Sequence, residues 1–142
     1  MVDKELLSRK LSRLRSYIDV LKQSEDITWE KYRSYLRTKA FVERYLHLAI
    51  EEVIDIANHL VSFNRWREPT GYRDLFSILS EHGVIGGEYL TTFQNMASFR
   101  NMLVHRYETV DDDLVFGLFK KRLDDFELFI RSVADWAEGQ KE

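Results

Sequence analysis

The chain has 142 residues, of which 44% are hydrophobic, enough for one compact core and too few for two. It has no cysteine, which excludes disulfides and thiolate metal sites, and no apolar run reaches the roughly 18 residues of a membrane span. The start of the chain is charged and lacks the apolar core of a signal peptide. We therefore expect a single domain over residues 1–142, located in the cytoplasm and without membrane contact.

The net charge of -3 hides a strong asymmetry along the chain. Residues 1–45 carry 11 Lys+Arg against 7 Asp+Glu, whereas residues 46–142 carry 10 against 17. Five of the cations in residues 1–45 lie close together in the second half of this segment: Lys31, Arg33, Arg37, Lys39 and Arg44. They form either an ordinary solvated helix face, which is the simpler interpretation, or a flank that attracts phosphate.

Apolar spacing of three and four residues predicts helices throughout. The first runs from about Asp3 to Gln23, a short helical turn follows near Trp29–Ser34, and a long helix ends near Phe63. The long helix is apolar on most sides, so we expect contacts on two of its faces. Its deepest positions are predicted to be Leu46, Ala49, Ile50, Val53, Ile56, Ala57 and Leu60.

After a connector over residues 64–71, the sequence predicts a short helix at Tyr72–His82 and a further helix from about Gly87 to Tyr107. A last helix is predicted from Asp111 to about Trp136, with an apolar and aromatic inner face. The expected fold is all-α, an antiparallel bundle of about five helices.

The helix that ends near Tyr107 combines four polar side chains of distinct chemistry. At roughly 100° per residue, Arg100 falls at the centre of its apolar stripe, and Tyr107 projects within about 20° of it. Asn101 and His105 lie four residues apart on the edge of the stripe. A cation on an apolar face needs a partner, or a cleft or subunit seam in place of a sealed core.

The carboxylates of the long helix offer one explanation for this cation. Glu52 or Asp55 is predicted either to neutralise Arg100 in a structural ion pair or to orient His105. Together with His59 these carboxylates also have a spacing that suits a metal, but two carboxylates and one imidazole are too few ligands. We expect neither a metal nor a cofactor.

The run of Arg100, Asn101, His105 and Tyr107 resembles the R-x-x-x-x-H-x-Y signature of the HEPN superfamily, specifically the HepT-type toxins of prokaryotic toxin–antitoxin pairs. The helix over residues 48–59, the connector at 69–74 and the lead-in to Arg100 are similar to that family in order and spacing. The resemblance covers nearly the whole chain and implies a HEPN-like helical bundle.

The resemblance implies a metal-independent endoribonuclease that acts as a homodimer. His105 would be the general base or acid, Arg100 would hold the phosphate, and Asn101 would orient either His105 or the phosphate. Arg106 and Asp55 would have supporting or RNA-binding roles. The implied antitoxin partner is an MNT-type nucleotidyltransferase, which would transfer AMP to Tyr107.

Two other functions fit the same residues. The chain could be a non-catalytic binding subunit that docks a nucleotidyltransferase or binds a nucleotide. It could also be a structural helical dimer in which Arg100 is paired with Glu52 or Asp55.

Overall fold

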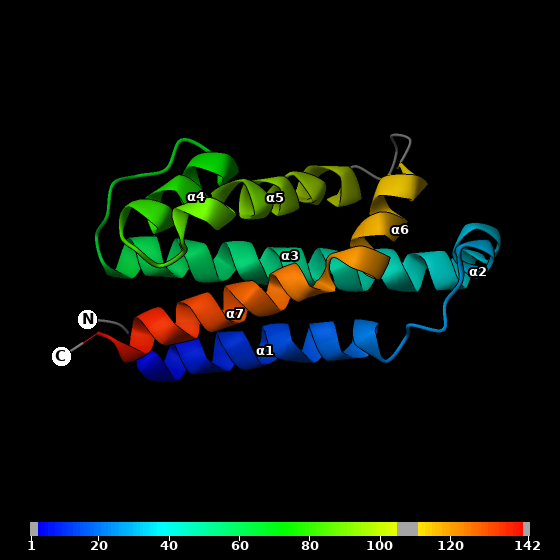
Figure 1. Cartoon of the computed structure of the whole chain (residues 1–142), viewed down its shortest axis with the longest axis horizontal. Coiled ribbons are helices and arrows are strands. Elements are labelled where there is room, and N and C mark those ends of the chain that lie inside the picture. Colours follow the sequence, from blue (N-terminus) through cyan, green and yellow to red (C-terminus); the bar gives the residue numbers. More distant parts are fainter. Residues whose placement is uncertain (1–2, 105–110, 141–142) are drawn as a thin grey trace.

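The computed structural model describes residues 3–104 and 111–140, and within these ranges every regular element is helical (Figure 1). The elements are α1 (Lys4–Lys22), α2 (Trp29–Ser34), α3 (Leu36–Phe63), α4 (Tyr72–Glu81), the 3₁₀ turn η1 (Gly87–Tyr89), α5 (Leu90–Val104), α6 (Asp112–Lys121) and α7 (Leu123–Glu138). The all-α prediction is confirmed. The described residues hold seven α-helices, more than the five or so predicted.

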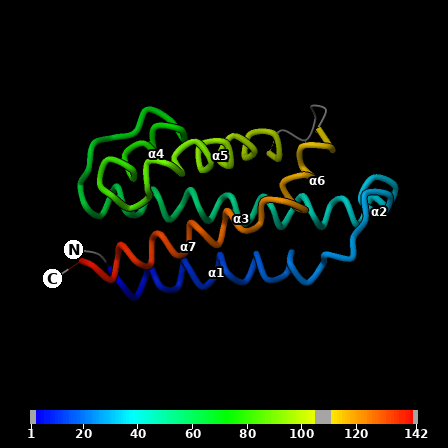
Figure 2. The backbone as a smooth tube through the Cα atoms, viewed as in Figure 1, coloured from blue at the N-terminus to red at the C-terminus, as the bar shows by residue number. Residues whose placement is uncertain are grey.

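The long helix α3 is the centre of the bundle, with α1, α4 and α5 packed along it. All seven positions predicted to lie deepest in α3 are buried. α1 packs on α3 through Leu7, Leu14, Ile18 and Leu21, and the side chain of Asp3 caps its first turn. α1 begins and α7 ends at one end of the bundle, and α2 lies at the opposite end (Figure 2).

The single last helix that the sequence predicted is divided in two. Arg122, between α6 and α7, has the non-helical angles φ -124° and ψ 11°. Neither glycine nor proline occurs at this position, so the local sequence did not predict the break. The break allows the aromatic face of α6 to pack at the α2 corner, where the Phe116 ring lies 5.3 Å from those of Trp29 and Tyr32, while α7 runs along α1 (Figure 1).

The connector between α3 and α4 is fixed by an exposed ion-pair network. Arg67 donates to both carboxylate oxygens of Asp74, at 2.8 and 2.9 Å, and to Glu81 at 2.6 Å. The hydrogen bonds from Arg67 and from the Thr70 N–H hold the pKa of Asp74 well below its usual range. α4 is therefore anchored to the connector at both of its ends.

None of the described helices is both long and apolar enough to cross a membrane.

Candidate functional site

Arg100 lies near the end of α5 and forms an ion pair with α3. Its Nε donates to Oε1 of Glu51 at 2.7 Å, and its side chain is 28% exposed. This hydrogen bond raises the pKa of Arg100 above its usual value, so the guanidinium stays charged. Phe93 and Met96 on the same stripe of α5 are buried as predicted. The cation therefore sits where the apolar stripe reaches the surface between α3 and α4.

The two carboxylates predicted to neutralise Arg100 bind other residues. Glu52 accepts from Arg13 at 3.3 Å, and Asp55 accepts from Lys10. Both of these cations belong to α1, because residues 52 and 55 of α3 face that helix while residue 51, about 100° away from Glu52, faces α5. The prediction of a Glu52 or Asp55 pair with Arg100 was wrong, and Glu51 is the residue that it missed.

Two further groups lie beside this ion pair, one against Arg100 and one against Glu51. The ring of Tyr72, the first residue of α4, lies 5.5 Å from the Arg100 Cζ, within cation–π range. His47 Nε2 lies 3.4 Å from the Glu51 oxygen that accepts from Arg100. The spacing of His47 and Glu51, four residues apart on one helix, was the only sequence signal for this arrangement.

The terminal nitrogens of the guanidinium are less engaged than Nε. Among the described residues, Nη1 has one long contact, 3.4 Å to Oδ1 of Asn101, whose side chain is otherwise exposed. Glu51 therefore holds Arg100 from the side, in an orientation that can present the Nη edge to an anion.

The other members of the motif, His105, Arg106 and Tyr107, lie outside the described residues. Their roles, like those of Arg100, Asn101 and Asp55, stay predictions. No group of three metal-ligating side chains occurs in the part of the chain that the structure describes.

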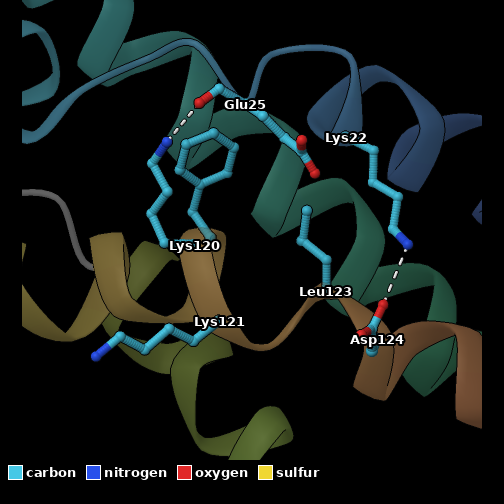
Figure 3. Close-up of a pocket in the computed structure, with 7 residues that line it drawn as sticks. Lys22, Glu25, Lys120, Lys121, Leu123 and Asp124 are labelled. Carbon is cyan, nitrogen blue, oxygen red and sulfur yellow. Dashed lines mark hydrogen bonds and ion pairs between the residues drawn. The ribbon is translucent and has the colours of Figure 1, made fainter.

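A second cationic region lies at the junction of α6 and α7, around a cavity of about 350 Å³. Lys120 donates to the backbone carbonyl of Glu25 at 2.6 Å, and Lys22 is bound by Asp124 at 3.1 Å and by Glu127. Lys121 extends away from Lys22 (Figure 3). Because two of its three lysines are already bound by protein oxygens, this cavity is a poor anion site.

Comparison with known proteins shows the family to which this chain belongs. Residues 8–133 match the family model described as Ribonuclease HepT-like. The tRNA nuclease HepT of Aphanizomenon flos-aquae is 25% identical over 132 residues, which cover 93% of this chain and 90% of that protein. The mRNA nuclease HepT of Shewanella oneidensis is 33% identical over 85 residues, which cover 60% of this chain and 64% of that protein.

Solved structures agree with the sequence comparison. A tri-AMPylated HEPN toxin of Shewanella oneidensis in complex with an MNT antitoxin superposes with a TM-score of 0.82 at 25% identity, covering 95% of this chain and 99% of that chain. The Bacillus subtilis protein YutE, described as a cytosolic protein of unknown function, superposes with a TM-score of 0.84 at 19% identity, covering 99% and 96%. The family model, the two nuclease relatives and the shared helical bundle show that this chain belongs to the ribonuclease HepT-like family of the HEPN superfamily.

Proposed function

We propose that this protein is a metal-independent endoribonuclease toxin whose centre is Arg100 together with His105. The observation that carries the proposal is the anchored arginine: Glu51 fixes its Nε at 2.7 Å, and Tyr72 lies against its guanidinium. A guanidinium held in this way is prepared to bind a phosphate through its Nη edge. The nuclease names of the two HepT relatives support RNA as the substrate.

The reaction needs no group beyond two imidazoles and a cation. One imidazole removes the proton of a ribose 2′-hydroxyl, and the oxygen attacks the adjacent phosphorus. Arg100 stabilises the charge on the non-bridging oxygens. The P–O5′ bond then breaks, and a second imidazole gives its proton to the leaving oxygen. The products are a 2′,3′-cyclic phosphate and a 5′-hydroxyl.

Each motif contains one histidine, and we propose that a second copy of the chain supplies the second imidazole. A two-fold dimer with the Arg100 and His105 faces in a shared cleft supplies base and acid from different subunits. The partly exposed position of Arg100 supports this arrangement, since the cation is neither sealed in the core nor fully solvated.

Regulation is proposed to act on Tyr107. The Shewanella oneidensis toxin that this fold resembles is tri-AMPylated and bound to an MNT antitoxin. By analogy, a nucleotidyltransferase partner transfers AMP to the Tyr107 hydroxyl of this chain. The added phosphate carries negative charge and would compete with RNA for Arg100.

The test uses chelator-treated protein incubated with RNA that carries a 5′ label. Wild type should produce fragments that end in a 2′,3′-cyclic phosphate, whereas Arg100→Ala and His105→Ala should each be slower by about a hundredfold or more. Arg100→Lys keeps the charge and loses the planar donors, so it should also be impaired.

Helix content by circular dichroism and the oligomeric state are the controls for these variants. If folded wild type leaves RNA intact and still binds the nucleotidyltransferase, the chain is the non-catalytic docking subunit, and the ribonuclease proposal fails.

A further inference from the structure

The corner formed by α2 and the start of α3 concentrates exposed positive charge. Residues 28–45 carry five Lys+Arg against two Glu in a chain whose net charge is negative. Lys39 is used within the fold, where it binds Asp112 at 2.8 Å. The other four cations are exposed and form no ion pair with any described residue: Lys31, Arg33, Arg37 and Arg44.

The acidic residues of the corner offset this charge only in part. Glu43 accepts from the Tyr32 hydroxyl at 3.1 Å and so faces α2, and Glu30 is exposed. No acidic residue lies in the first turn of α3. A net positive surface therefore remains, and it suits a polyanion.

Two of these cations are aligned with the candidate site. Arg37, Arg44 and Glu51 are seven residues apart on α3, and such positions drift by only about 20° per step around a helix. They lie on the solvent side of α3, where Ala40 is also exposed. At the end of this line Glu51 holds Arg100 at 2.7 Å.

The line has a length that suits a single nucleic-acid strand. From Arg37 to Glu51 it spans about 21 Å, at roughly 1.5 Å per residue, which corresponds to about six stacked nucleotides at roughly 3.4 Å each. The next position of this line, Asn58, is exposed and uncharged, so the line of positive charge ends near Arg100. The end of α5 and the start of α6 also lie toward the α2 end of the bundle (Figure 1).

The corner also exposes an aromatic ring. Tyr35 is 62% exposed and Leu36 is 81% exposed, although both are large apolar residues. Tyr35 lies between Arg33 and Arg37 in sequence, at the junction of α2 and α3. An exposed ring between cations is the combination that binds single-stranded nucleic acid, since cations bind phosphates and a base stacks on the ring.

We infer that Arg33, Tyr35, Arg37 and Arg44 form a track that binds single-stranded RNA and leads it to Arg100. This inference rests on the proposed ribonuclease function, because it names where that site receives its substrate. Tyr35 stacks on a base at the outer end, and Arg37 and Arg44 bind phosphates about three nucleotides apart along α3. Arg100 binds the phosphate that is cut.

The first experiment measures binding without any cleavage. The probe is a fluorescein-labelled, mixed-sequence single strand of 12 nucleotides with 2′-O-methyl groups throughout, which cannot be cut by 2′-hydroxyl attack. The double variant Arg37→Gln with Arg44→Gln should bind roughly tenfold more weakly at low salt, and the slope of log K against log salt should fall by about 1.4, or about 0.7 for each lost phosphate contact. The matched control, Lys121→Gln with Arg131→Gln, removes two exposed cations from α6 and α7 and should change neither value.

The second experiment separates base stacking from apolar docking. Tyr35→Ala should weaken binding by roughly five- to a hundredfold, the range for losing one stacked base. Tyr35→Phe should bind as wild type does, and Tyr35→Leu should behave like the alanine variant. If Tyr35→Leu bound the probe as tightly as wild type does, or if any track variant no longer formed a dimer, the corner would be a protein interface. Either result would overturn the inference.

Failure of the track and failure of the ribonuclease proposal give different results. If wild type cuts RNA and the arginine double variant binds the probe and cuts long RNA as well as wild type does, the track is wrong and the ribonuclease stands. If no variant cuts RNA but binding depends on the track residues, the catalytic proposal fails and the track stands as a binding surface.

Discussion

Glu51 determines where the motif arginine points, through one hydrogen bond of 2.7 Å to Nε. We expect Glu51→Ala to lower the rate of RNA cleavage by roughly tenfold to a hundredfold, because misplacing a charge stabiliser by about 1 Å has an effect of that size. The loss should appear in kcat more than in KM, since the residue orients Arg100 and does not itself bind RNA.

The conservative variant is the control for this prediction. Glu51→Asp should recover part of the rate, whereas a residue that only stabilised the fold would show no such graded recovery in kcat. The Glu51 side chain is 41% exposed, so both variants should keep wild-type helix content. Full activity in Glu51→Ala would show that Arg100 does not depend on this anchor.

Tyr107 is the predicted site of modification. Co-expression with the cognate nucleotidyltransferase should add one or more AMP units to wild type and none to Tyr107→Phe, as read by intact-mass spectrometry. The phenylalanine keeps the ring but has no hydroxyl to accept AMP. Tyr89→Phe, which alters an exposed tyrosine on η1, should still be modified. An adduct on another tyrosine, or neutralisation without any adduct, would contradict this prediction.

At the scale of the elements, the rotation of α3 about its axis assigns its three neighbouring carboxylates to different partners. Glu51 faces α5, while Glu52 and Asp55 face α1. The hydrophobic pattern predicted which side of α3 is buried. It did not predict which partner helix lies on which flank, and this is why Glu52 and Asp55 were expected to bind Arg100.

The burial of Glu52 has a consequence for pH dependence. Its side chain is 6% exposed and Oε2 has no hydrogen-bond partner within the described structure. Burial raises the pKa of this carboxyl, and Arg13 opposes the shift. The raised pKa means that the protonated form of Glu52 is favoured in the folded state. Protonation of Glu52 therefore stabilises the fold fully when the pH is below the unfolded-state pKa, and this stabilisation is lost as the pH rises through the folded-state pKa.

Glu52→Gln removes this titration and keeps the side-chain volume. Relative to wild type, the variant should gain on the order of 1 kcal/mol in the free energy of unfolding at roughly pH 7, and the gain should vanish below roughly pH 4. Urea denaturation across this pH range measures it. Asp55→Asn, which alters an exposed carboxylate of the same helix, should show no such gain. A Glu52→Gln variant that is less stable than wild type at neutral pH would mean that the ion pair with Arg13 outweighs the cost of burial.

At the scale of the whole molecule, the proposed mechanism requires two chains. Analytical ultracentrifugation at micromolar concentration should show a dimer, and a monomer would remove the mechanism with two histidines. A mixing experiment tests whether the site is shared. After wild type and His105→Ala are co-expressed in equal amounts, activity per chain should fall to about a quarter of wild type if only wild-type homodimers cut RNA, and to about a half if each chain works alone.

The sequence by itself determined the helices, the residues of the core and the motif. Periods of three and four residues set the buried face of each helix. The bounds of α1, α2 and α4 and the end of α3 agree with prediction to within about two residues. The signature around Arg100, together with the order and spacing of the helix over residues 48–59 and the connector at 69–74, predicted the family, which the match to the family model confirms.

The tertiary structure decided which residues meet across helices. The last helix is divided at Arg122, although no residue there breaks a helix by itself. The break lets the aromatic residues of α6 pack on the α2 corner. The tertiary structure also assigned Glu51 to Arg100, and it placed Arg37 and Arg44 in line with that pair. Hydrophobic patterning sets the buried side of each helix, but the rotation and packing of helices far apart in sequence set the partners of the charges at its edges.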